Sequence, residues 1–170
     1  MLKFIPKRFL HVGQTIPQMN LTIVSGNEQK YNIEKSVDSI KFFGNKKIVL
    51  VGFPGAFTPT CTGSHIPEFI KLNDKFKEKG VEVVGLAIND PFVLKEFGEE
   101  LQASIPFICD GTMNFTKAIE AGVDLTAHAL GFRTRRFTAL VENGTITQLN
   151  DEKGATMSDV SKAETILRLL

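Results

Sequence analysis

Cysteine is scarce in this sequence of 170 residues, which has two cysteines and no tryptophan. Two cysteines cannot form a disulfide framework, so we expect a hydrophobic core to stabilise the fold. A surplus of one charge sign is also missing, because 20 Lys and Arg residues stand against 19 Asp and Glu residues. A formal net charge of +1 gives no broad basic surface for nucleic acid or for an anionic membrane. Partners must therefore be inferred from individual sites.

A convincing membrane-spanning segment is missing as well. The one uncharged stretch of sufficient length, residues 48–67, contains three prolines and several hydroxyl side chains. Prolines in that position would leave backbone groups unpaired in lipid. We therefore expect a protein that does not cross a membrane.

The chain begins with a basic and apolar segment, MLKFIPKRFL, and no acidic residue precedes Glu28. This pattern fits either the remnant of an organelle-targeting peptide or an ordinary frayed terminus. We expect residues 1–11 to be an extension and residues 12–170 to be one domain, because no linker, repeat or low-complexity tract divides them. The expected location is intracellular, in the cytosol or in an organelle such as a mitochondrion or plastid.

Apolar β-branched runs alternate with amphipathic helical segments along the chain. The pattern predicts strands at residues 21–24, 48–53, 81–88, 105–109, 135–141 and 145–149. It predicts helices at residues 37–43, 58–80, 114–121 and 159–170, and another that starts at Pro91 behind a cap at Asn89 or Asp90. Turns are expected at residues 25–27 and at Asn143-Gly144. This order predicts an α/β fold, a thioredoxin-like sandwich with a central mixed sheet and helices on both faces.

The most informative stretch is FPGAFTPTC, from Phe53 to Cys61, between a buried strand and the long helix. Open α/β sheets place their sites at this end of a strand. If Pro59 is the first helical residue, the N–H groups of Thr60 and Cys61 lack helical partners and favour an anion. A cysteine in that position has an enlarged thiolate fraction, as a nucleophile requires. The alternative is a buried and inert thiol.

A cation that stabilises a Cys61 thiolate must come from elsewhere in the chain, since its neighbours carry no formal charge. The expected source is the cluster formed by Arg133, Arg135 and Arg136, whose alternative interpretation is a solvated surface turn. Strand alternation directs Arg135 and Arg136 to opposite faces, so at most one or two of the arginines can face the site. His65, one helical turn beyond Cys61, is expected to be a hydrogen-bonding buttress or a packed ring rather than a base.

The motif Pro54-x-x-x-Thr58-x-x-Cys61, the run PGAFTPTCTGSHIPEF and the downstream RRF resemble the peroxiredoxins. They resemble in particular the fifth, atypical subfamily, which includes alkyl hydroperoxide reductases. The resemblance extends from about Val12 to the end of the chain. It implies a thiol-dependent peroxidase that reduces hydrogen peroxide and alkyl hydroperoxides through a cysteine sulfenic acid, with no cofactor and no metal.

The same resemblance implies a role for each residue of the motif. Cys61 would attack the peroxide, and Arg136 would hold both the sulfur and the peroxide. Thr58 would hydrogen-bond the substrate and the thiolate, while Pro54 would shield the pocket from water. Further substrate-binding residues would be Gly55, Thr60 and His65. One conflict arises at Thr58, because a hydroxyl that caps the helix cannot also serve the substrate.

A second, resolving cysteine, which several members of the family carry before the last helix, is replaced here by Met157. The other cysteine, Cys109, ends an apolar run and is interpreted as a packed thiol. We therefore expect a mechanism with one cysteine, in which an external thiol reduces the Cys61 sulfenic acid. Glutathione with a glutaredoxin is the first expectation and thioredoxin the second. A disulfide between Cys61 and Cys109 is the reserve possibility.

Other functions remain open at this point. One alternative is a thiol–disulfide oxidoreductase. The run Thr58-Pro59-Thr60-Cys61 has the spacing of a Cys-x-x-Cys pair, although the hydroxyl of Thr58 stands in place of the first sulfur. A peroxide sensor would oxidise Cys61 once and report to a partner. A zinc site would have to combine Cys61, His65, Cys109 and His128, whose spacing matches no usual metal signature.

The resemblance also implies a homodimer that meets near the active-site loops. On that basis we expect contacts at Phe57, at Phe92 and in the loop near Phe115 or Phe132. Most of the 14 phenylalanines must nevertheless belong to the core.

Overall fold

The continuously apolar run at residues 48–53 forms an interior strand of the main sheet, β3 (Lys47–Gly52). The computed structural model describes residues 9–27 and 30–170, so the expected targeting remnant lies largely outside the described residues. The other strands are β1 (Asn20–Asn27), β2 (Lys30–Asp38), β4 (Glu82–Ala87), β5 (Phe107–Cys109), β6 (Gly122–Asp124), β7 (Phe132–Thr134), β8 (Phe137–Glu142) and β9 (Thr145–Asp151). The helices are α1 (Ser39–Phe43), α2 (Ile66–Lys71), α3 (Asn73–Glu78), α4 (Pro91–Glu100), α5 (Asn114–Ala118) and α6 (Ala163–Leu167), with a π-helical turn η1 (Cys61–His65) and a 3₁₀ turn η2 (Thr126–His128).

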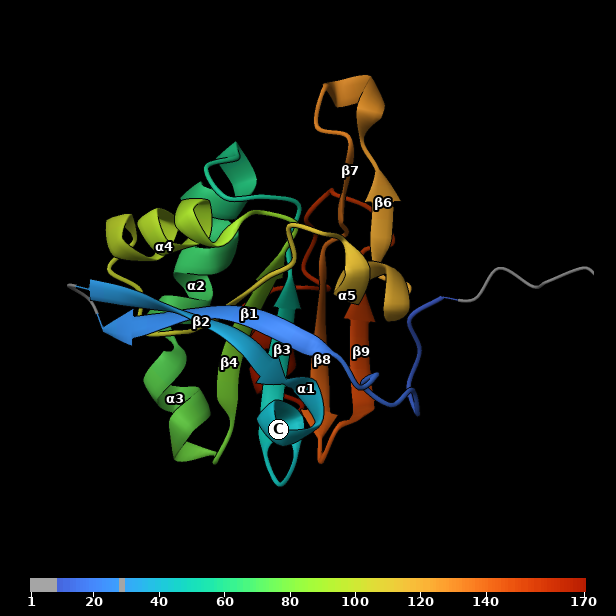
Figure 1. Cartoon of the computed structure of the whole chain (residues 1–170). Helices are drawn as coiled ribbons and strands as arrows, with labels where there is room; N and C mark the ends of the chain where they lie inside the picture. Colours follow the sequence, from blue (N-terminus) through green and yellow to red (C-terminus); the bar gives the residue numbers. More distant parts are fainter. Residues whose placement is uncertain (1–8, 28–29) are drawn as a thin grey trace, which may run out of the picture.

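The main sheet has seven strands in the order β2-β1-β5-β4-β3-β8-β9 (Figure 1). β4 pairs in parallel with both β3 and β5, and the other neighbours pair antiparallel. β6 and β7 form a separate ribbon that projects from the body of the molecule in Figure 1. The predicted mixed sheet is therefore confirmed, and its parallel part aligns the carboxyl ends of three strands at one edge.

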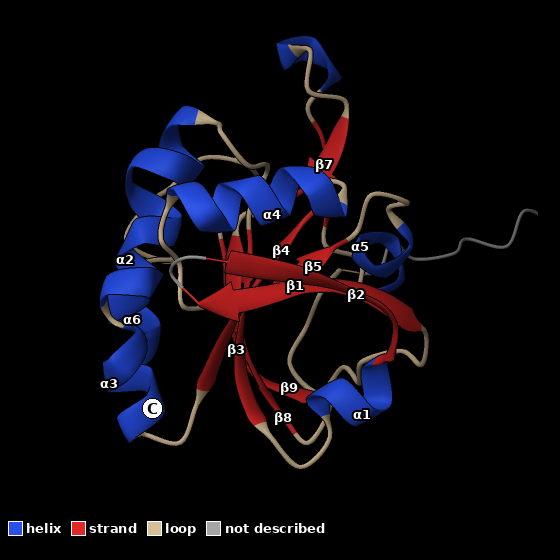
Figure 2. Ribbon diagram, turned by 60° about the vertical axis from the view of Figure 1, so that its left-hand side comes forward, coloured by secondary structure: helices blue, strands red, loops and turns tan. Residues whose placement is uncertain are grey.

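Helices cover the sheet on both faces, as Figure 2 shows. α2, α3 and α6 lie together on one side, whereas α1 and α5 lie on the other. Each face has its own hydrophobic core. The first includes Phe53, Cys61, Ile66, Phe69, Phe76, Leu94, Phe97 and Ile166, and the second includes Phe43, Leu50, Leu86, Phe115, Phe137 and Ala139. The sulfur of the motif is thus embedded in the core under α2.

Local signals account for several boundaries. Asp90 caps α4 by accepting hydrogen bonds from the backbone N–H groups of Phe92 and Val93, so Asp90 is the cap rather than Asn89. At the predicted tight turn, Asn143 and Gly144 have φ angles of 50° and 77°. Two consecutive left-handed residues are what a two-residue hairpin needs, and the β8–β9 hairpin is confirmed.

Two expectations about the elements are wrong, and one strand was not predicted. Residues 25–27 do not turn, because β1 continues through them to pair with β2. β2 itself escapes prediction, since its exposed positions, Glu34 and Lys35 among them, break the apolar pattern on this edge strand. The last helix is far shorter than residues 159–170, and Val160 lies exposed outside it instead of packing inward.

None of the helices within residues 9–27 and 30–170 combines the length and the apolar character that crossing a membrane requires.

Candidate active site

The cysteine of the motif lies in the first turns of the helix that follows β3. The helix begins at Pro59, and its first turn is closed by a 3.0 Å hydrogen bond from the N–H of Thr62 to the carbonyl of Thr58. The N–H groups of Thr60 and Cys61 precede that bond, where helical acceptors are lacking. The backbone widens into a π-helical turn from Cys61 to His65, a feature that is frequent at functional sites.

Arg136 holds the sulfur of Cys61. Its Nη2 lies 3.5 Å from Cys61 Sγ, its Nη1 lies 2.9 Å from Nδ1 of His65, and its Nε donates to the carbonyl of Ala155 at 3.0 Å. Arg136 is only 2% exposed, and Cys61 and His65 are fully buried. The permanent positive charge of Arg136 therefore lies directly against the sulfur, in a setting almost closed to solvent.

The other two arginines of the cluster bind groups other than the sulfur. Arg135 lies on the opposite face and forms a buried ion pair with Asp151, at 2.7 Å between Nη2 and Oδ2. Arg133 donates to the carbonyls of Leu130 and Pro54, the second at 3.4 Å. Arg135 and Arg136 lie between β7 and β8 rather than inside the strand predicted at 135–141, yet their side chains reach different partners as expected. Both are buried, so the interpretation as a solvated turn is wrong. Of the three, Arg136 is the one bonded to the sulfur.

His65 is a neutral link in this network. Burial and the neighbouring Arg136 lower the pKa of His65 from 6.5 to about 3, against the opposing influence of Ser161 and Glu152. Nδ1 therefore accepts from Arg136, and Nε2 donates to the carbonyl of Ser161 at 3.2 Å. Its ring also packs edge-on against Phe69. A ring that stays neutral and saturated with hydrogen bonds is a support for the guanidinium rather than a base.

This lowered pKa predicts acid-sensitive stability. In the unfolded chain the His65 imidazole takes up a proton below 6.5, whereas in the folded chain it resists protonation down to about 3, so stability is full above 6.5 and is lost as the pH falls. From about pH 7 to about pH 5, the unfolding free energy of the wild type should drop by about 2 kcal/mol more than that of His65→Gln. Chemical denaturation of both proteins at the two pH values measures this difference in unfolding free energy. Equal pH dependence of the two proteins would contradict a neutral His65.

The loop before the cysteine is held by contacts from other elements. The Thr58 hydroxyl donates to the carbonyl of Gly55 at 2.8 Å, and within the described part of the chain its oxygen accepts no hydrogen bond from a helix N–H, so it does not cap the helix. The N–H of Ala56 donates to Oδ1 of Asn89 at 3.0 Å. A Cβ at Gly55 would lie 2.9 Å from Nη1 of Arg133, so glycine allows the arginine to approach the loop. The expected conflict over the Thr58 hydroxyl therefore does not arise.

Phe57 adopts a left-handed backbone, with φ of 60°, which is unusual for a bulky residue. Its ring packs edge-on against Phe97 of α4, with 5.3 Å between ring centroids, and this contact compensates part of the backbone strain. The remaining motif residues differ in exposure: Pro54 and Gly55 are buried, Thr58 is half-buried, and Thr60 is exposed.

Sequence reasoning missed two residues that support the site. Asn89 was considered only as a helix cap, yet it binds the loop at Ala56. Its position after β4, parallel and adjacent to β3, was the available signal, because such strand ends share one edge. Ser161 supports His65 through its backbone carbonyl, for which no signal exists in a single sequence.

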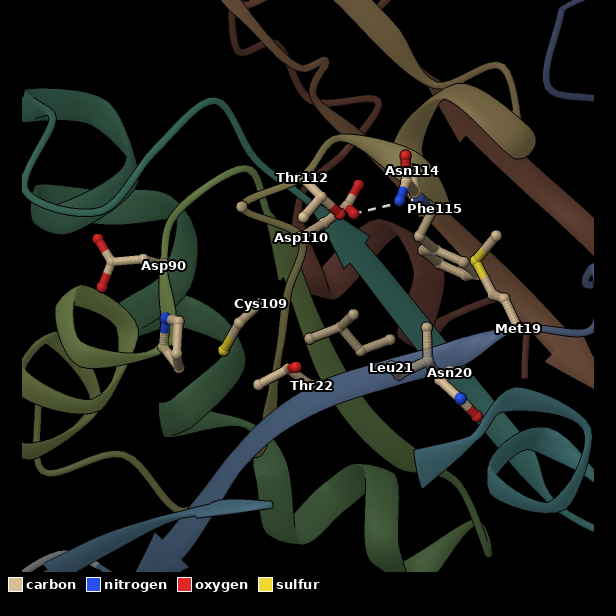
Figure 3. Close-up of a pocket in the computed structure, with 13 residues that line it drawn as sticks. Met19, Asn20, Leu21, Thr22, Asp90, Cys109, Asp110, Thr112, Asn114 and Phe115 are labelled. Atoms are coloured by element: carbon tan, nitrogen blue, oxygen red, sulfur yellow. Dashed lines mark hydrogen bonds between the residues drawn. The ribbon is translucent and has the colours of Figure 1, made fainter. Parts of the chain in front are cut away.

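Cys109 lies in a different environment from Cys61. Figure 3 shows its side chain near Thr22 and Asp90, at a cavity of about 510 Å³ that Cys61 does not line. Burial raises the pKa of the Cys109 thiol to about 12, so this sulfur stays protonated. Its interpretation as a packed thiol agrees with this geometry. Met157, in contrast, lies near the active-site helix, with Sδ 3.7 Å from the hydroxyl of Ser64.

A buried thiol engaged by an arginine therefore lies at the strand edge of a mixed α/β sheet, an arrangement suited to thiol redox chemistry. The family model described as Redoxin matches residues 11–167. The curated protein Peroxiredoxin-2D from Arabidopsis thaliana is 39% identical over 162 residues, which cover 94% of this chain and 97% of that protein.

Solved structures agree. Reduced Prx3 in complex with hydrogen peroxide from Vibrio vulnificus has a TM-score of 0.83 and 36% identity, covering 95% of this chain and 96% of that one. The antioxidant protein (1-Cys peroxiredoxin) of Plasmodium falciparum has a TM-score of 0.81 and 29% identity, with coverages of 94% and 97%. The chain belongs to the redoxin family and, within it, to the peroxiredoxins, so it is a thiol-dependent peroxidase with a thioredoxin-like fold.

Proposed function

We propose that Cys61 is the peroxidatic cysteine of this enzyme and that its substrates are hydrogen peroxide and alkyl hydroperoxides. The Cys61 thiolate attacks one peroxide oxygen, the O–O bond breaks, and the departing hydroxide or alkoxide takes a proton to leave as water or alcohol. The cysteine remains as a sulfenic acid. The observation that carries this proposal is the 3.5 Å contact between Nη2 of Arg136 and Sγ of Cys61.

The surrounding groups favour the transition state of this attack. Negative charge moves from the sulfur to the departing oxygen, so fixed donors near both atoms bind the transition state more tightly than the ground state. Arg136 supplies the cationic donors, and the N–H groups of Thr60 and Cys61 supply neutral ones. Gly55 completes the cradle, and His65 acts on the substrate only through Arg136.

Thr58 and Pro54 control how the peroxide reaches the sulfur. The Thr58 proton is engaged with the carbonyl of Gly55, so its oxygen lone pairs are oriented to accept a hydrogen bond from a peroxide O–H. Thr58 is half-buried whereas Cys61 and Pro54 are buried, which makes the side of Thr58 the route of entry. Buried Pro54 excludes water without offering a donor of its own.

We propose that an external thiol regenerates the enzyme. The thiol attacks the Cys61 sulfenic acid, water leaves, and a mixed disulfide forms that a second thiol cleaves. Met157, which has no thiol, stands near the active-site helix, and Cys109 is buried at another cavity, so neither offers a resolving thiol to Cys61. Glutathione with a glutaredoxin is the proposed reductant, and thioredoxin the second candidate.

Steady-state peroxide consumption tests this step. With glutathione, glutaredoxin and their reductase we expect many turnovers, and slower recycling with thioredoxin and its reductase. A single turnover followed by arrest in both systems would favour a peroxide sensor. Reduction of insulin disulfides without peroxide turnover would favour a thiol–disulfide oxidoreductase.

We propose a homodimer that uses the exposed aromatic residues beside the active-site loop. Phe57 is 46% exposed and Phe92 is 70% exposed, which is unusual for such large apolar side chains. Phe115 itself is buried against Phe43 in the core, so its ring is not proposed as a contact. Phe132 is half-buried and stays a candidate contact.

The proposed location is the cytosol or an organelle. Recycling by thiols requires a reducing compartment, and a chain with two unpaired cysteines suits one. Relatives of this chain include proteins named as mitochondrial and as chloroplastic.

A further inference from the structure

Glu152, just after β9, ties a surface segment together by its carboxylate. Oε1 accepts hydrogen bonds from the N–H of Ser158 at 2.8 Å and from the N–H and hydroxyl of Ser161 at 3.1 and 2.8 Å. Oε2 accepts from the Ser158 hydroxyl at 2.8 Å. Four hydrogen bonds to one carboxylate close residues 152–161 into a loop with its two ends joined.

This loop encloses Arg136. The N–H of Arg136 donates to the carbonyl of Gly154 at 2.7 Å, and its carbonyl accepts from the N–H of Glu152 at 3.1 Å. The Nε of Arg136 donates to the carbonyl of Ala155 at 3.0 Å. Backbone and side chain of the arginine are therefore both fixed by the segment that Glu152 closes.

The far end of the loop reaches the same guanidinium by a second route. Ser161, which Glu152 binds through two donors, offers its carbonyl to Nε2 of His65. The other ring nitrogen of His65 accepts from Nη1 of Arg136. The remaining guanidinium nitrogen, Nη2, is the one directed at Cys61 Sγ. Both routes from Glu152 end on the group that contacts the sulfur.

The carboxylate is suited to this role. Partial burial raises the pKa of Glu152, but the hydrogen bonds from Ser158 and Ser161 outweigh that cost and keep this pKa below its usual value. Glu152 is therefore ionised at neutral pH and accepts all four hydrogen bonds at once.

We propose that Glu152 is a positioning residue for the peroxidase reaction, which fixes the Arg136 guanidinium against Cys61 through the closed loop and through Ser161 and His65. The inference rests on the proposed roles of Cys61 and Arg136. Glu152 does not touch the reacting atoms. Its contribution is the geometry of the cation that does.

The test compares second-order rate constants with hydrogen peroxide, measured by stopped flow well below the melting temperature of each variant. Glu152→Ala should be slower by about tenfold to a hundredfold, because a misplacement of about 1 Å costs that much. Glu152→Gln retains an acceptor for Ser161 and should recover most of the rate. Asp159→Ala, which removes an exposed carboxylate of the same segment, is the matched control and should keep the wild-type rate.

A double-mutant cycle separates positioning from a general structural role. Since Glu152 acts through Arg136, the double variant of Glu152→Ala and Arg136→Ala should be no slower than Arg136→Ala alone. Independent losses that multiply would overturn the inference, and so would a Gln variant as slow as the Ala variant.

The outcomes also separate this inference from the proposed function. Full activity of Glu152→Ala beside a slow Arg136→Ala would overturn the inference alone, whereas full activity of Arg136→Ala would overturn the proposed site itself. If Glu152→Ala does not fold, Glu152→Asp carries the test. Its side chain is too short to reach all four donors, so an intermediate rate is expected, and a wild-type rate would count against positioning.

Discussion

Replacing Cys61 by serine should abolish peroxidase activity, with a loss of at least about a thousandfold in the rate constant for hydrogen peroxide. The hydroxyl of serine is not ionised at neutral pH, so Arg136 would face a neutral oxygen instead of a sulfur anion. Arg136 makes its 3.5 Å contact with Sγ, and among the described residues no other side chain donates to this atom. Stopped-flow or coupled assays with hydrogen peroxide measure the loss.

Cys109→Ser is the matched control for this variant. Cys109 lies at a different cavity, and burial keeps its thiol protonated, so its removal should leave most of the rate intact. A buried hydroxyl in its place costs stability, of the order of 1–3 kcal/mol, so both variants must be assayed well below their melting temperatures. An inactive Cys109→Ser beside an active Cys61→Ser would overturn the assignment of the nucleophile.

Arg136→Ala should have the second largest effect, a loss of about a hundredfold to a thousandfold in the same rate constant. In the proposed mechanism the arginine holds the sulfur before the reaction and stabilises the departing oxygen during it. Arg133→Ala should lose less than about tenfold, because Arg133 reaches the site only through the carbonyl of Pro54 at 3.4 Å. The pair is well matched, since both variants delete a guanidinium from the same short segment.

The loss in Arg136→Ala has to be separated from damage to the fold. Its removal leaves His65 Nδ1 and the carbonyl of Ala155 without their donors, at a cost of about 1–3 kcal/mol for each buried group. Arg136→Lys keeps the charge but cannot bond the sulfur, His65 and Ala155 together, so an intermediate rate is expected. Equal rates for Arg136→Ala and Arg133→Ala would contradict the choice of arginine.

Much of the fold followed from local patterns in the sequence. The apolar run of β3, the Asp90 cap and the Asn143-Gly144 turn each depend on a few neighbouring residues, and each is observed. The edge strand β2 and the short helix α6 could not be predicted from local patterns. Their boundaries depend on pairing with β1 and on the packing of the 152–161 loop, which no local window contains.

The candidate site likewise has a part that could be predicted from local sequence and a part that could not. The motif around Cys61 is local, so its position after a buried strand could be predicted. Alternation placed Arg135 and Arg136 on opposite faces without choosing between them. The resemblance to peroxiredoxins implied Arg136, and the folded chain brings Arg136 to the sulfur and Arg135 to Asp151. The position of Asn89 after β4 was an available signal for its contact with the loop. The support from Ser161 and Glu152 could not be predicted, because it depends on a carbonyl and on a loop closure between distant segments.

The most direct test is to map the cysteines after reaction with one equivalent of hydrogen peroxide in the presence of a sulfenic acid trap, by mass spectrometry of peptides prepared without reductant. The account predicts one trapped sulfenic acid, on the peptide that contains Cys61, with Cys109 unmodified. A trap on Cys109, or a disulfide that joins Cys61 to Cys109, would contradict it.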